Sequence, residues 1–137
     1  REEGVAILIT THYLSEAEHC DRLALMYAGR IVAEGTPAHL KKQVERDIGQ
    51  LVEMVVDKPG IALAHVVAAG FAGAALFGTK IHVLSRDPGR DEGRLRDVLA
   101  RSGIAVGSVR TRMLSLEDVF VSRVMALEQA AQKEVSA

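Results

Sequence analysis

The chain has 137 residues, enough for one ordinary domain or for one small domain and part of another. Its 17 basic and 18 acidic residues nearly balance and 48% of its residues are hydrophobic, so we expect a globular protein and exclude a strongly basic nucleic-acid-binding surface. The single cysteine, Cys20, cannot form an internal disulfide, and no secretory leader pattern is present, which predicts an intracellular protein.

The first elements are typical of the end of an α/β sheet. Val5 to Ile9 is a continuous apolar run, as expected for a strand covered on both faces. The run comes almost at once and without an initiator methionine, which indicates a piece of a longer polypeptide. Ser15 and Glu18 form a capping-box pattern, which predicts a short helix that starts at Ser15.

A hairpin and a second short helix follow. Strands are predicted at residues 23–27 and 31–33, joined by a turn at Gly29. Thr36 as N-cap and Pro37 in the first turn predict a helix to about residue 44. A cluster of charges and a glycine then places a domain boundary near Asp47, so residues 1–47 form the first unit.

The next unit reads strand, helix, strand, strand, helix, strand. The strands are expected at residues 50–57, 71–77, 80–84 and 105–112, with helices after Pro59 and around Leu95 to Ser102. This order predicts a ferredoxin-like fold of four antiparallel strands with two helices on one face, and the first and third strands in the centre. The fold class is therefore α+β.

One more helix and a tail complete the chain. Ser115 and Asp118 form a second capping pattern, and an apolar stripe that begins at Leu116 predicts a C-terminal helix. We assign residues 48–127 to the ferredoxin-like domain with this extra helix, and residues 128–137 to a flexible tail. The apolar stretch from Ile61 to Gly78 approaches membrane-spanning length, but its alanines, glycines and His65 argue against insertion.

His12 is the most specific candidate for a functional residue. It comes three residues after the predicted strand at Val5 to Ile9, and ligands in open α/β sheets bind beyond the carboxyl ends of strands. An imidazole there can donate a hydrogen bond to a phosphate oxygen. A metal site made of His12, Glu16 and His19 is not expected, because His12 precedes the helix and the three side chains do not share a face.

The stretch from Ile9 to Gln43 resembles the end of the nucleotide-binding domain in the ATP-binding subunits of ABC transporters. The shared features are Thr11-His12, the acidic helix with Glu18, the pair Asp21-Arg22 and the sequence GRIVAEGTP. The remainder, with SLEDVFVSRV at residues 115–124, is similar to the accessory domain of the branch that works with exporter-type (ABC-2) membrane partners in bacteria.

The resemblance implies roles for several residues. His12 would be the catalytic and nucleotide-binding residue, a switch histidine that contacts the γ-phosphate of ATP, while Ser15, Glu18, Asp21 and Arg22 would give structural support. The whole protein would bind ATP and Mg²⁺, form a homodimer and work with a transmembrane permease. It would lie at the cytoplasmic face of the cell membrane, without binding nucleic acid.

Several family motifs are missing from this sequence. It contains no G-x-x-x-x-G-K-[ST] phosphate loop, no glycine-rich signature motif and no catalytic glutamate after a Walker B strand. We therefore expect the fragment alone to bind no cofactor and to hydrolyse no ATP. Two alternatives stay open: a fragment of a soluble or ribosome-associated ABC ATPase, and a regulatory module that senses a small ligand.

Overall fold

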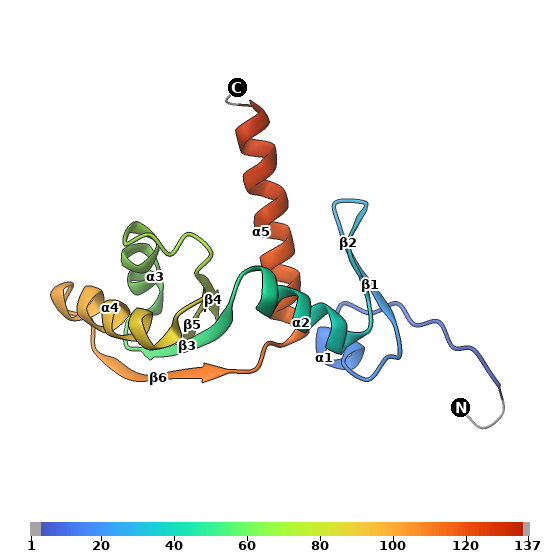
Figure 1. The fold of residues 1–137 in the computed structure, drawn as a ribbon, viewed down its shortest axis with the longest axis horizontal. Coiled ribbons are helices and arrows are strands. Elements are labelled where there is room, and N and C mark those ends of the chain that lie inside the picture. Colours follow the sequence, from blue (N-terminus) through green and yellow to red (C-terminus); the bar gives the residue numbers. More distant parts are fainter. Residues whose placement is uncertain (1–3, 136–137) are drawn as a thin grey trace.

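The computed structural model describes residues 4–135, which form a mixed α+β fold (Figure 1). In chain order its elements are α1 (Leu14–Ala17), β1 (Leu23–Tyr27), β2 (Arg30–Gly35), α2 (Pro37–Asp47), β3 (Gln50–Val56), α3 (Pro59–Ala68), β4 (Ala75–Phe77), β5 (Lys80–Ser85), α4 (Pro88–Arg101), β6 (Val106–Arg112) and α5 (Leu116–Val135). The strands make two antiparallel sheets, one of two strands and one of four.

The segment before α1 is extended and irregular. The predicted strand at Val5 to Ile9 is absent, and the four large apolar side chains in it are 63–98% exposed. A strand needs hydrogen-bonded neighbours for its backbone groups, and none of the described residues supplies one to this segment. Figure 1 shows this part of the chain running away from the rest of the molecule.

The first sheet is a hairpin formed by β1 and β2. Its turn contains Ala28 and Gly29, both with positive φ angles of 49° and 74°, which suit the twist of a tight hairpin. The helix α2 that follows begins as predicted, because the side chain of Thr36 accepts a hydrogen bond from the backbone N–H of His39 and Pro37 occupies the first turn.

The second sheet has the strand order β4-β5-β3-β6, so β3 and β5 are central, as predicted. Helices α3 and α4 pack on one face of it, where a buried cluster brings residues of both helices against β3 and β5: Val52, Met54, Ile81, Val83, Ala62, Val66, Leu95 and Leu99. Strand β4 covers only Ala75–Phe77 and is shorter than predicted, because residues 69–74 form turns after α3.

Helix α5 belongs to a second buried cluster, which it shares with the N-terminal part of the chain. It packs against α1, α2 and β2, and the cluster contains Ala17, Leu25, Leu40, Val44, Leu51, Leu114, Leu116 and Val119. Only Leu51 and the partly buried Leu84 represent the four-stranded sheet there. In Figure 1, α5 rises between the sheet and the N-terminal part.

Helix α5 is also longer than predicted. It continues through residues 128–135, which the sequence analysis assigns to a flexible tail, and the last two residues of that tail lie outside the described residues. Among residues 4–135, no helix has the length and apolar content needed to cross a bilayer. The apolar stretch from Ile61 to Gly78 instead contains most of α3, the turns after it and β4.

Candidate functional site

The loop that carries His12 lies directly before α1. Its imidazole is exposed, and its ring centroid lies 4.1 Å from that of Tyr13. The hydroxyl of Thr11 donates to Glu16 Oε2 at 2.8 Å and accepts from the backbone N–H of Tyr13 at 3.0 Å. These two hydrogen bonds fix the loop against the start of α1, while the imidazole remains accessible to a ligand.

The predicted capping box of Ser15 and Glu18 is wrong. Helix α1 begins at Leu14, its N-cap is Tyr13 without a side-chain hydrogen bond, and Ser15 lies exposed inside the helix. Since α1 has only four residues, Glu18 is its C-cap and faces other elements. The local pattern failed because Glu18 has partners far away in the sequence.

Asp21 and Arg22 lie in the exposed bend before β1. Arg22 Nη2 is 3.4 Å from Glu34 Oε1 on β2, and both side chains are mostly exposed. An exposed ion pair of this kind contributes at most about 1 kcal/mol to stability. The contact joins the bend before β1 to β2.

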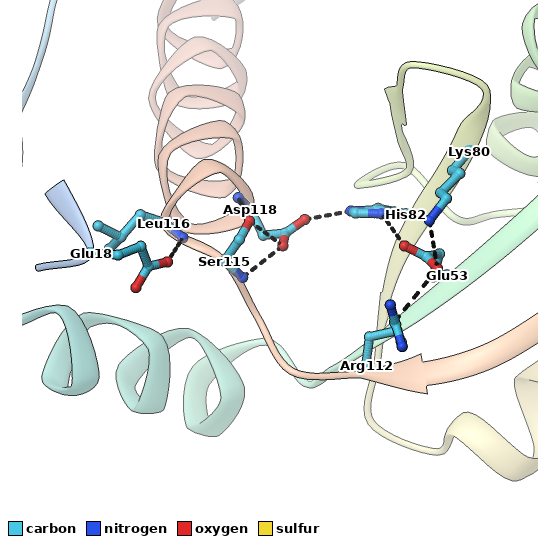
Figure 2. Close-up of polar contacts among 8 residues, drawn as sticks. All are labelled: Glu18, Glu53, Lys80, His82, Arg112, Ser115, Leu116 and Asp118. Atoms are coloured by element: carbon cyan, nitrogen blue, oxygen red, sulfur yellow. Dashed lines mark hydrogen bonds and ion pairs between the residues drawn. The ribbon is translucent and has the colours of Figure 1, made fainter. Parts of the chain in front are cut away.

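Glu18 contacts the N-terminus of α5 (Figure 2). Its Oε1 accepts a hydrogen bond from the backbone N–H of Leu116 at 3.1 Å, and its Oε2 is 2.6 Å from Lys41 Nζ on α2. The predicted cap of α5 is confirmed: Ser115 N–H donates to Asp118 Oδ2 at 2.9 Å, and Asp118 N–H donates to Ser115 Oγ at 3.2 Å. Glu18 and Ser115 thus supply acceptors for the N–H groups of Leu116 and Asp118 in the first turn of α5, and Asp118 supplies one for the residue before it.

A second set of polar contacts joins α5 to the sheet. Asp118 Oδ1 lies 2.5 Å from His82 Nδ1 on β5, and His82 Nε2 lies 3.3 Å from Glu53 Oε2 on β3. Glu53 also pairs with Lys80 Nζ at 3.1 Å and Arg112 Nε at 3.6 Å. Figure 2 shows these side chains in a continuous row from α5 across the face of the sheet that α3 and α4 leave uncovered.

Charges in this row shift three pKa values. For His82, burial alone would lower the pKa, but the hydrogen bonds and charges of Asp118 and Glu53 outweigh burial and raise it. For Asp118, burial acts to raise the pKa, and the hydrogen bonds from His82 and Ser115 lower it overall. For Glu53, burial again acts upward and is outweighed by Lys80 and His82, so the pKa is lowered.

Sequence reasoning missed this row. His82 and Glu53 are not among the predicted site residues, although alternation along β3 and β5 places both on the face opposite Met54 and Ile81. Strand register pairs Glu53 directly with His82, and tertiary packing brings Asp118 to the same histidine. Neither can be read from the local sequence. Among residues 4–135, no group of three His, Cys, Asp or Glu side chains is arranged to hold a metal ion.

The chain is similar to several curated ATP-binding proteins. It is 50% identical over 46 residues to the "Probable multidrug ABC transporter ATP-binding protein YbhF" of Escherichia coli, which covers 34% of this chain and 8% of that protein. It is 33% identical over 120 residues to the "Nod factor export ATP-binding protein I" of Rhizobium sp. (strain N33), covering 86% of this chain and 36% of that protein.

A third relative is the "Energy-coupling factor transporter ATP-binding protein EcfA1" of Clostridium novyi, 37% identical over 60 residues, which cover 39% of this chain and 21% of that protein. No family model matches the chain. The chain spans just over a third of the Nod factor export protein and a smaller share of the other two relatives.

Proposed function

We propose that the chain, which is similar to the ATP-binding proteins of ABC transporters, forms the C-terminal part of such an ATP-hydrolysing subunit. In this proposal, residues 1–47 are the end of the nucleotide-binding domain, residues 48–127 are an accessory domain and residues 128–137 are a tail. The observation that carries the proposal is the similarity to an export ATP-binding protein over 86% of this chain.

His12 is the residue that we propose takes part in the chemistry. Its imidazole is exposed on a loop that Thr11 holds in shape, so one ring N–H is free to reach a phosphate oxygen. A hydrogen bond to the γ-phosphate would stabilise the negative charge that develops as the phosphoryl group is transferred to water. ATP and Mg²⁺ would be held by a phosphate loop outside this sequence, because no such loop occurs in it.

The exposed N-terminal segment supports the same proposal. Val5, Ile7, Leu8 and Ile9 are large apolar side chains in contact with solvent, although their pattern is that of a strand buried on both faces. Neighbouring strands of a larger sheet would cover these side chains and pair with their backbone groups. The segment would then be the strand that leads directly into the His12 loop.

We further propose that residues 50–112 form a ferredoxin-like accessory domain. The element order from β3 to β6, the strand order β4-β5-β3-β6 and the two helices on one face support this classification. Its role would be regulation or dimerisation of the ATPase, in a homodimer that works with a transmembrane permease at the cytoplasmic face of the membrane. The relatives are named for transport and export, which does not favour a ribosome-associated ATPase or a ligand-sensing module.

The test is ATP turnover by the longer polypeptide that contains this chain, with His12→Ala as the variant. Loss of a charge-stabilising group in phosphoryl transfer is expected to lower kcat about 10²-fold or more. The matched control is His19→Ala, which removes another exposed histidine seven residues away and is expected to leave kcat unchanged. Unchanged turnover in His12→Ala, or a longer polypeptide without a phosphate-binding glycine loop, would overturn the proposal.

A further inference from the structure

The first turn of α5 is bound from two directions. Glu18, which follows α1, accepts from the backbone N–H of Leu116, and His82 on the sheet contacts Asp118. The side chain of Asp118 accepts from the backbone N–H of Ser115, and the side chain of Ser115 accepts from the backbone N–H of Asp118. The N–H of Leu116 has Glu18 as its acceptor. Leu116 is 1% exposed, so water has poor access to this N–H.

Helix α1 depends on this contact for its position. With only four residues and no side-chain cap, it is far below the length at which a helix is stable by itself. Its position is set by the packing of Ala17 in the cluster around α5 and by the two partners of Glu18, Leu116 and Lys41. The His12 loop is in turn tied to α1 through the hydrogen bond between Thr11 and Glu16.

From these contacts we propose that Glu18 is a positioning residue, which holds the His12 loop in register with α5 and, through Asp118 and His82, with the accessory sheet. The inference rests on the proposed function, since it assumes that His12 contacts phosphate. The contacts form an unbroken series: the loop is bonded to α1, Glu18 to the first turn of α5, and that turn to β5 and β3. A displacement of the accessory sheet would therefore shift the imidazole at the nucleotide.

The experiment uses the longer polypeptide and compares Glu18→Ala with Glu18→Gln and Glu45→Ala. Glu18→Ala removes the acceptor, and a misplacement of the His12 loop by a fraction of an ångström is expected to lower kcat about tenfold. KM for ATP should change less than about twofold, because the loss is confined to the transition state. Glu18→Gln retains an oxygen that accepts from Leu116, so kcat should recover to within about threefold of the parent. Glu45→Ala, exposed on α2, should match the parent.

Amide hydrogen exchange in the same protein gives a readout that does not depend on activity. Glu18→Ala should accelerate exchange at Leu116 and across residues 12–17, and leave Val52 in β3 unchanged. A purely structural role would instead accelerate exchange throughout the second cluster and leave kcat per folded molecule at the parent value. That result, or a kcat unchanged in Glu18→Ala, would overturn the inference.

Two further variants separate the possible failures. If Glu18→Ala does not fold, Lys41→Ala is measured in its place, because it removes only one of the two partners of the Glu18 carboxylate. A kcat about threefold lower supports the inference, and an unchanged kcat contradicts it. His12→Ala is measured alongside. If it lowers turnover while the Glu18 variants do not, Glu18 has no positioning role and the proposed function stands. If His12→Ala has no effect, the proposed function fails, and the inference fails with it.

Discussion

Replacement of His82 by glutamine tests the polar row between α5 and the sheet. His82 contacts two carboxylates, at 2.5 Å from Asp118 and 3.3 Å from Glu53, and its side chain is 13% exposed. A hydrogen bond to a charged group contributes about 1.5–3 kcal/mol. Since Glu53 keeps Lys80 and Arg112 as partners and Asp118 keeps Ser115, the variant should lose the equivalent of one strong contact, about 2–3 kcal/mol in the free energy of unfolding.

The loss should depend on pH in a defined direction. The pKa of His82 is raised in the folded chain by Asp118 and Glu53 against the opposing effect of burial, so its contribution is complete below about pH 6.5 and is lost as the pH rises through the folded pKa. The pKa values of Asp118 and Glu53 are lowered, so their contributions are present above about pH 4 and are lost on acidification. The row should therefore stabilise the fold most between about pH 5 and 6.5.

Urea unfolding at pH 5.5, 7.0 and 8.5 measures the effect, with His65→Gln on the exposed face of α3 as the control. The difference between the parent chain and His82→Gln should be largest at pH 5.5 and shrink at pH 8.5, whereas the control should stay within about 0.5 kcal/mol at every pH. A difference that is constant or grows with pH would show that His82 does not act as a charged bridge.

Three other substitutions test separate features of the fold. Gly49→Ala should destabilise the chain by at least about 2 kcal/mol in urea unfolding, since Gly49 has φ +142° and a Cβ there would lie 2.3 Å from the backbone oxygen of Ser85; wild-type stability would refute the close approach. Leu99→Ala, in the fully buried face of α4, should cost about 2–5 kcal/mol by calorimetry, and a loss below 1 kcal/mol would argue against the packing described. Ser85→Ala should raise the pKa of Asp91, which the Ser85 hydroxyl lowers against the effect of burial; a carboxyl titration by NMR that matches the parent would contradict this.

The local elements of residues 50–112 followed from the sequence because each carries its own signal. Alternation in β3, the proline in the first turn of α3 and the glycine stops after the two helices are local patterns. The rule that crossovers are right-handed then placed β3 and β5 in the centre of the sheet. Two boundaries were wrong. The length of β4 was overestimated, because an apolar run does not show where turns end and strand pairing begins. Helix α4 begins at Pro88, well before the stretch from Leu95 to Ser102 where the helix was expected.

Three other failures share one cause, which is that the deciding contact is distant in sequence. The apolar run at Val5 to Ile9 has no neighbouring strand among the described residues, so the pattern alone could not make a strand. The carboxylate of Glu18 binds Leu116, 98 residues away, in place of the local N-terminus at Ser15. His82 and Asp118 are 36 residues apart and meet only once the sheet and α5 are assembled.

Helix α5 also shows this difference between local sequence and distant contacts. By sequence it follows β6 and was assigned to the accessory domain, yet Leu116, Val119 and Phe120 pack with elements of the N-terminal part. Each fully buried leucine or valine contributes about 1.5–3 kcal/mol, whereas the sheet contributes Leu51 and the partly buried Leu84 to this cluster, together with the polar contact between His82 and Asp118. Helix α5 is therefore bound more firmly to the His12 side of the molecule than to the sheet that precedes it. His82 supplies the polar contact between the four-stranded sheet and α5, so its replacement should weaken this link without removing a side chain from either buried cluster.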